Sequence, residues 1–154
     1  MLAVAFAAAL GGCGEDNTTA NNDAGAIHND SGTIPAPTTF AEQVSLGRST
    51  YIANCSSCHG VSGEGGAGPR LVGLDMGALP LEPREGAVRT TQFVTVADVA
   101  AFAVAAMPPV DPGSLSAEEY WAVLAFALSA NGITLEQKLT PELAATLTIP
   151  REEP

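Results

Sequence analysis

Two cysteines and a histidine lie within five consecutive residues, Cys55-Ser56-Ser57-Cys58-His59. In the pattern Cys-x-x-Cys-His, the two thiols lie three positions apart on one helical turn, so each can form a thioether with a vinyl group of the same porphyrin. The adjacent histidine then lies under the iron, where its imidazole can serve as the proximal ligand. These residues predict one covalent haem c, attached through Cys55 and Cys58, with His59 as an iron ligand.

Two other kinds of site share part of this pattern. Cys-x-x-Cys also occurs in thioredoxin-like dithiol sites and as half of many zinc sites. A thioredoxin-like site needs alternating strands and helices around it, and a structural zinc needs four ligands. The chain has one further cysteine, Cys13, and one further histidine, His28, both near its N-terminus. We therefore favour haem, and zinc and dithiol chemistry stay as alternatives.

Residues 1–13 form an apolar run of small residues that ends at Cys13, and the chain turns polar at Glu15. This run is too short to span a bilayer, but it fits the hydrophobic part of a secretory signal peptide. The tetrapeptide Leu-Gly-Gly-Cys that ends at Cys13 resembles a bacterial lipobox, in which the cysteine carries lipid. We expect a periplasmic protein that is lipid-anchored to a bacterial membrane. An ordinary signal peptide or a short buried helix is the alternative.

Residues 14–39 are rich in Asn, Thr, Asp, Gly and Pro and have almost no large apolar side chains. Such a segment cannot bury a core, so we predict a disordered linker that tethers a folded domain. His28 falls in this linker, where a solvated side chain is a better interpretation than an iron ligand. Because Cys13 would carry lipid and Cys55 and Cys58 would carry haem, we predict no disulfide despite an oxidising compartment.

The sequence from residue 40 onward predicts helices. Aromatic residues make up 5% of the chain and alanine and leucine are frequent, which favours helices over a sheet. Phe40, Val44, Gly47 and Tyr51 recur at the spacing of one helical face in a helix that leads into the cysteine motif.

Two more helices are expected before residue 132. One spans 95–106 and is halted by the prolines at 108 and 109. The next begins at Ser116, which forms a capping box with Glu119, and it stops at Asn131-Gly132. A Gly-rich loop, 60–73, follows the cysteine motif. We therefore place one folded domain at residues 40–132.

Residues 40–131 resemble a class I cytochrome c domain. The matching pieces are Cys-Ser-Ser-Cys-His-Gly at 55–60, Gly-Pro-Arg-Leu-Val-Gly at 68–73, Met-Pro-Pro at 107–109 and the last helix. The resemblance implies an all-α class I cytochrome c fold, with about three to five helices around one covalent haem. In that family the first and last helices cross at a glycine beside interlocked aromatic residues, which correspond here to Gly47, Tyr51 and Phe126.

The second axial ligand of the iron has one good candidate. Met1 and Cys13 belong to the export segment and His28 to the linker, while Met76 follows the Gly-rich loop too closely to reach the opposite haem face easily. Met107 remains, and the two prolines after it would hold its thioether toward a metal. A buried methionine at a helix end is otherwise ordinary core packing. His/Met ligation would fill both axial positions and favour Fe(II).

The resemblance also implies roles for neighbours of the iron. A metal-bound histidine normally donates its other N–H to an oxygen, and the family's Gly-Pro-x-Leu segment implies the carbonyl of Pro69 for this role. Leu71 would then pack on the haem ring. Arg70 is a candidate partner of a haem propionate or a solvated surface residue. Trp121 is interpreted as helix-interface core, with donation to a propionate as the alternative.

Residues 133–154 extend beyond the minimal domain. Thr140 followed by Pro141 predicts a helix start, so a short helix through Leu147 is expected. Met-Pro-Pro, Leu-Ser-Ala-Glu-Glu-Tyr, Ala-Asn-Gly and Leu-Thr-Pro-Glu-Leu together look like the cytochrome domains that accompany quinoprotein alcohol dehydrogenases.

The net charge of the chain is −11, and residues 1–39 carry four acidic and no basic side chains. This charge argues against nucleic acid binding and against adhesion to anionic lipid. We predict a monomeric electron carrier without catalytic residues, whose redox partners are a dehydrogenase, a quinol-oxidising complex or a terminal oxidase. A cytochrome subunit of a periplasmic dehydrogenase complex and a haem-based ligand sensor are the alternatives.

Overall fold

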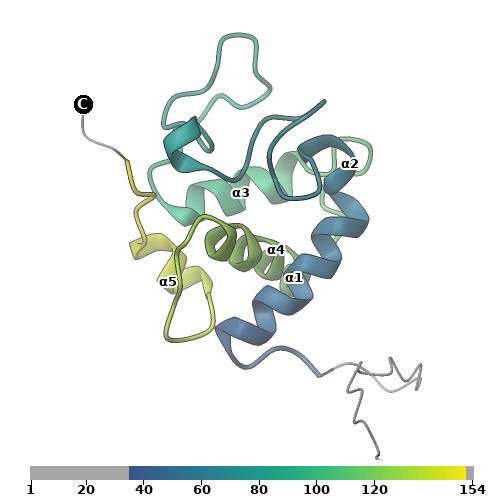
Figure 1. Ribbon diagram of the computed structural model, residues 1–154, viewed down its shortest axis with the longest axis vertical. Coiled ribbons are helices and arrows are strands. Elements are labelled where there is room, and N and C mark those ends of the chain that lie inside the picture. Colours follow the sequence, from purple (N-terminus) through teal and green to yellow (C-terminus); the bar gives the residue numbers. More distant parts are fainter. Residues whose placement is uncertain (1–34, 152–154) are drawn as a thin grey trace, which may run out of the picture. The chain divides into compact units, whose positions relative to one another are not determined.

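The computed structural model describes residues 35–151 (Figure 1). The predicted signal peptide and lipobox at 1–13, with Cys13, lie outside the described residues. So does the predicted linker up to residue 34, with His28. Within the described part of the chain, no helix is both long enough and apolar enough to cross a membrane.

Helices make up the regular structure of residues 35–151, which confirms the predicted all-α fold class. The five α-helices are α1 Phe40–Asn54, α2 Ser56–His59, α3 Val96–Ala106, α4 Ala117–Ala130 and α5 Pro141–Thr146. A short 3-10 helix, η1, spans Leu74–Met76. Thr140 caps the start of α5 as predicted, and Leu147 is the cap residue after its last residue, Thr146.

The three longest helices each start with a capping box, as expected for the helix that begins at Ser116. The pairs of cap and third helical residue are Thr39 with Glu42, Thr95 with Asp98, and Ser116 with Glu119. Backbone N–H groups at the helix starts are the main reason why the pKa of each of these three carboxyls lies below its usual value. A pKa lowered by folding stabilises the fold above the ordinary carboxyl pKa, and that stabilisation is lost as the pH falls through the folded value.

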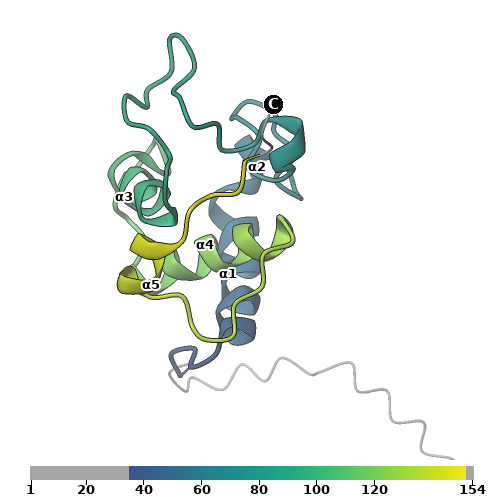
Figure 2. The ribbon, with the colours of Figure 1, turned by 90° about the vertical axis from the view of Figure 1, so that its left-hand side faces the viewer.

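Helices α1 and α4 cross in direct backbone contact (Figure 2). A Cβ atom at Gly47 would lie 1.8 Å from the carbonyl oxygen of Ala122, so only glycine fits at this point. Beside the crossing, the rings of Tyr51 and Phe126 lie 5.1 Å apart at an interplanar angle of 41°. The crossing that the resemblance implied for these residues is present.

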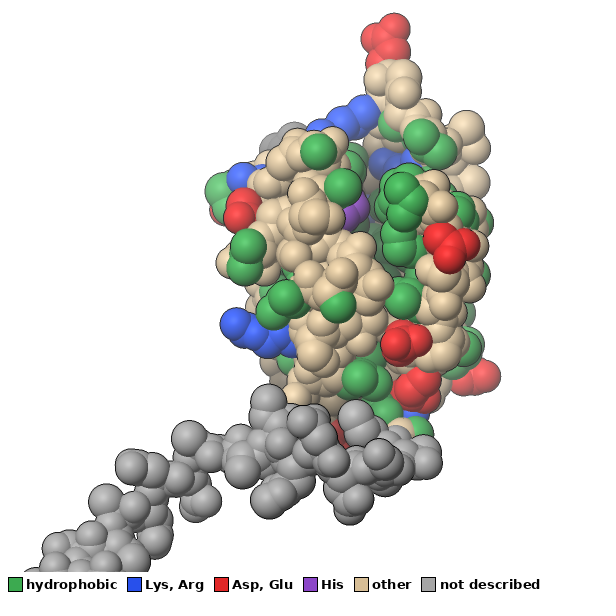
Figure 3. All heavy atoms as spheres, turned by 90° about the vertical axis from the view of Figure 1, so that its right-hand side faces the viewer, with side chains coloured by type: hydrophobic (Ala, Val, Ile, Leu, Met, Phe, Trp, Pro, Cys, Tyr) green, Lys and Arg blue, Asp and Glu red, His purple; other side chains and the backbone are tan. Residues whose placement is uncertain are grey.

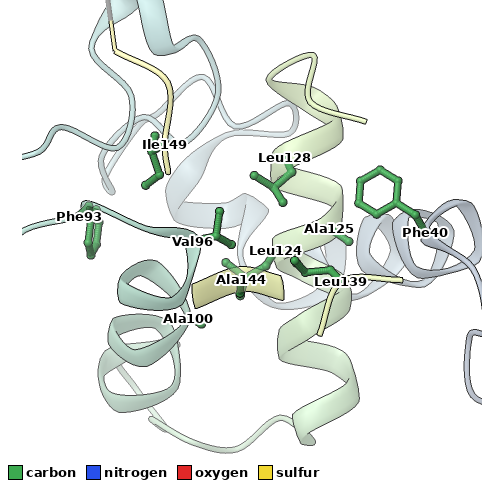
Figure 4. Packing of buried hydrophobic residues seen from close by; sticks show 10 residues of the cluster. All are labelled: Phe40, Phe93, Val96, Ala100, Leu124, Ala125, Leu128, Leu139, Ala144 and Ile149. Carbon is green, nitrogen blue, oxygen red and sulfur yellow. The ribbon is translucent and has the colours of Figure 1, made fainter. Parts of the chain in front are cut away.

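The hydrophobic core combines α1, α3 and α4 with the segment after residue 132 (Figure 4). Its buried members are Phe40, Phe93, Val96, Ala100, Leu124, Ala125, Leu128, Leu139, Ala144 and Ile149. The last three come from the C-terminal extension, so residues 133–151 pack into the same core as the helices before them.

The side chain of Gln43, which is fully buried in α1, joins the C-terminal segment to the first helix. Its Nε2 donates to the carbonyl oxygen of Leu139 at 3.0 Å, and its Oε1 accepts from the Leu139 amide at 2.8 Å. Farther along, the Val96 amide donates to the Leu147 carbonyl at 2.9 Å and the Ile149 amide to the Val94 carbonyl at 3.0 Å. These bonds pair backbone groups of the C-terminal segment that no helix pairs.

A long loop, 77–93, projects from the helices between η1 and α3 (Figures 1 and 2). Arg89 is buried where the two ends of this loop meet the helices. Its guanidinium lies 3.8 Å from the centre of the Phe93 ring. This guanidinium donates to four backbone carbonyls, those of Pro80, Leu81, Glu82 and Thr91. Arg151 donates to the carbonyls of Leu79 and Phe93.

Candidate haem site

The cysteine motif forms a single helical turn at the end of α1. Cys55 is the C-cap residue of α1 and the N-cap residue of α2. Its carbonyl accepts hydrogen bonds from the amides of Cys58 at 3.2 Å and His59 at 3.0 Å. Cys55 is half-buried and Cys58 is exposed, and both thiols are free. Burial, with a smaller effect of Cys58, raises the pKa of the Cys55 thiol. The two sulfurs and the imidazole therefore come from one turn of helix.

The ring of His59 is buried and its orientation is fixed. Its side-chain Nδ1 lies 2.7 Å from the carbonyl oxygen of Pro69. A carbonyl oxygen can only accept, so Nδ1 carries the proton and Nε2 keeps its lone pair. A histidine in this tautomer can bind a metal through Nε2, while the carbonyl holds the ring in one orientation.

The Gly-rich loop folds back onto this turn. The amides of Gly65 and Gly68 donate to the carbonyls of His59 at 2.7 Å and Cys58 at 2.8 Å. A Cβ atom at Gly68 would lie 2.9 Å from Cε1 of His59. The backbone of the loop therefore packs directly against the ring, and a side chain at position 68 would crowd it. On the other side, the hydroxyl of Tyr51 donates to the Gly60 carbonyl at 2.6 Å. Burial raises the pKa of Tyr51 to about 12, so the hydroxyl keeps its proton at neutral pH.

Asn131, which the sequence marked only as a helix stop, joins this loop to the end of α4. Its Nδ2 donates to the carbonyls of Leu71 and Ala127, both at 2.9 Å, and its Oδ1 accepts from the Gly73 amide at 2.8 Å. The backbone of Leu71 is thereby fixed next to the site. Its predicted contact with the haem ring stays a prediction.

The remaining candidates lie in different surroundings. Nη1 of Arg70 donates to the Val72 carbonyl at 3.2 Å, and Trp121 packs against the core cluster, as expected for an interface residue. Their alternative roles beside a propionate stay predictions. Met76 is 61% exposed and its methyl group lies beside Gly73, so its thioether is not held in the buried interior.

Met107 is half-buried at the end of α3, where the backbone turns extended before Pro108. Its amide donates to the carbonyl of Ala103 at 2.9 Å, and its carbonyl accepts from the hydroxyl of Tyr120 at 2.6 Å. Nothing in the local sequence pattern around Tyr120 indicates this hydrogen bond, which joins residues 13 positions apart.

The residues present fit a haem. Figure 3 shows a hollow in the described part of the molecule, with the histidine side chain inside it and hydrophobic side chains along one wall. Two free thiols one helical turn apart and an imidazole with an open Nε2 are the groups that covalent haem attachment needs. Among the described residues, no three His, Cys, Asp or Glu side chains converge to hold a metal ion, so this part of the chain supplies no zinc ligand set.

The family model described as Cytochrome C oxidase, cbb3-type, subunit III matches residues 42–126, more than half of the chain. The chain belongs to this cytochrome c family. A domain of this family transfers electrons, and its cofactor is a covalently bound haem c. Cys55, Cys58 and His59 stay its predicted points of attachment and ligation.

One solved structure resembles this chain in fold and sequence. A chain of sulfane dehydrogenase SoxCD from Paracoccus pantotrophus is 30% identical, with a TM-score of 0.53. The match covers 70% of this chain and 53% of that one, so the chain spans about half the length of its relative. No curated protein matches the chain significantly.

Proposed function

We propose that the protein is a periplasmic electron carrier whose haem iron is ligated by His59 and Met107. The observation that carries this proposal is the 2.7 Å hydrogen bond from Nδ1 of His59 to the Pro69 carbonyl, which leaves Nε2 free to bind a metal. The bound haem c supplies one reversible electron by alternating between Fe(II) and Fe(III). The protein's own part is to hold both ligands in place and to exclude other ligands from the iron.

Both ligands would be held by their backbones in either oxidation state. Backbone bonds from the Gly-rich loop fix the turn that carries His59. Bonds from α3 and from Tyr120 fix the backbone of Met107 on both sides of its Cα. A site held in this way changes little when the iron gains or loses an electron, which suits rapid transfer.

Carbon monoxide tests the closed site. Wild-type reduced protein is expected to bind carbon monoxide poorly, because His59 and Met107 would both ligate the iron and leave it no open position. Met107→Ala should bind it on the order of 100-fold more tightly, since the open fraction rises from about 1% to nearly all molecules. The substitution should also lower the reduction potential, because the thioether favours Fe(II). Both effects are measured by optical titration.

Met76→Ala is the matched control for this experiment. It removes the other methionine thioether of residues 35–151 at a side chain that is 61% exposed, so carbon monoxide binding should equal that of the wild type. Strong binding by the wild-type protein would contradict the ligation by His59 and Met107 and favour a haem-based sensor.

The similarity to a chain of a dehydrogenase structure supports a second function, that of a cytochrome subunit in a dehydrogenase complex. A free monomeric carrier should purify alone, and its partners would be a dehydrogenase, a quinol-oxidising complex or a terminal oxidase. A subunit should purify with a catalytic chain in a fixed ratio. Affinity purification from native membranes at low salt separates the two, because encounters of free carriers are short-lived.

The lipobox-like tetrapeptide supports the placement of the protein on the periplasmic face of a membrane by a lipid on Cys13. Cys13→Ser should move the haem protein from the membrane fraction into the soluble periplasmic fraction. Haem-stained gels of the fractions measure this shift. If the variant stayed with the membranes, the anchor would not be at Cys13.

A further inference from the structure

We propose that Tyr120 is a positioning residue, whose hydroxyl holds the segment of Met107 so that the thioether stays on the iron. This inference rests on the proposed function, because it takes Met107 as the second axial ligand. Tyr120 itself lies in α4 and reaches Met107 through one hydrogen bond to the backbone.

The hydroxyl of Tyr120 makes two hydrogen bonds to one loop. It donates to the Met107 carbonyl at 2.6 Å and accepts from the Gly113 amide at 3.0 Å. The ring is 6% exposed, so solvent competes little for these bonds. A single side-chain oxygen therefore joins the two ends of the loop 107–113.

The loop itself has little else to hold it. Three of its seven residues are prolines, which lack an amide donor, and residues 109–113 are exposed. Val110 is 94% exposed and contributes nothing to the core. Inside the loop, the Asp111 amide donates to the Pro108 carbonyl at 3.0 Å. The contacts of Tyr120 are thus the tie between this loop and the buried part of α4.

Both backbone polar groups of Met107 are satisfied, one from each neighbouring helix. Its amide is held by the Ala103 carbonyl in α3 and its carbonyl by Tyr120 in α4. Two such bonds define the orientation of the backbone from which the thioether projects. Without the hydroxyl, the partly buried carbonyl loses its partner, and only the bond to α3 still holds the backbone of Met107.

Helix α4 is a rigid support for this hydroxyl. The capping box of Ser116 and Glu119 fixes the start of the helix, and the Tyr120 amide donates to the Ser116 carbonyl at 3.1 Å. One turn later, Leu124 lies in the core cluster. The hydroxyl therefore acts from a fixed point, which is what a positioning group requires.

Tyr120→Phe removes the hydroxyl and leaves the ring. In the reduced haem protein, we expect carbon monoxide to bind about tenfold faster than in the wild type, since losing one buried hydrogen bond changes a local opening equilibrium by about that factor. The weak long-wavelength absorption of a thioether-bound ferric haem should decrease.

Gln43→Leu is the control for lost stability. The Gln43 side chain also bonds to a buried backbone, but its partner is Leu139 in the C-terminal segment and not a residue of the haem site. This variant should lose thermal stability without faster carbon monoxide binding. Equal binding rates in Tyr120→Phe, Gln43→Leu and a closed wild type would overturn the positioning role and leave the proposed ligation intact.

Amide exchange tests the inference without a variant. In the reduced wild-type haem protein, the Gly113 amide should exchange at least about tenfold more slowly than the amide of the exposed Val110. Exchange of Gly113 at the rate of Val110 would overturn the proposal even if Tyr120→Phe failed to fold. An open iron in the wild-type protein would instead contradict the ligation by Met107.

Discussion

Replacing Cys55 and Cys58 together by serine is expected to abolish the haem stain of the protein on a denaturing gel. Serine hydroxyls do not form the thioethers that keep a haem attached to an unfolded chain. Each single variant keeps one thiol on the same helical turn, so it should retain one thioether and a weaker stain. The double variant should also lose helical signal in circular dichroism, because no haem would then fill the hollow around His59.

Cys13→Ser is the matched cysteine control, and its stain should equal that of the wild type. A stain that persists in the double variant would contradict attachment through Cys55 and Cys58. A wild-type protein without stain that contained zinc by elemental analysis would favour the zinc alternative.

Gly47→Ala is expected to destabilise the protein by about 3 kcal/mol, because overpacking at a backbone contact forces two helices apart. The added methyl would lie 1.8 Å from the carbonyl oxygen of Ala122, and that oxygen cannot move without the rest of α4. The higher helix propensity of alanine offsets only about 1 kcal/mol of a larger strain. The melting temperature of the haem protein should fall on the order of 10 °C.

Ser49→Ala is the control for helix propensity, since Ser49 is exposed two residues farther along α1. Its melting temperature should stay close to that of the wild type or rise slightly. If Gly47→Ala had the same melting temperature as Ser49→Ala, the close approach of α1 and α4 would not be needed for stability.

Gly47→Ala should also change the predicted haem site. α1 carries Cys55 at its end, and α4 carries Tyr120, so a change in their crossing shifts the two sides of the predicted haem site against each other. Carbon monoxide binding to Gly47→Ala should therefore increase along with the loss of stability, whereas Ser49→Ala should leave it unchanged.

Sequence alone determined the features that depend on neighbouring residues. The capping box at Ser116, the end of α3 before Pro108 and the turn that carries the cysteines all follow from interactions over about four residues. The spacing of cysteines and histidine is likewise local, which is why it predicted a haem before any fold was known. The family resemblance added the crossing at Gly47, which local patterns do not contain.

Only the tertiary structure decided which distant groups meet. Gln43 pairs with Leu139 across 96 positions, and Tyr120 bridges Met107 and Gly113. Such bonds join one side chain to a remote backbone carbonyl or amide, so neither hydrophobic periodicity nor residue type marks them in advance. The same reason explains why the extension after residue 132 was expected only as a short helix, although its Ala144 lies fully buried in the shared core.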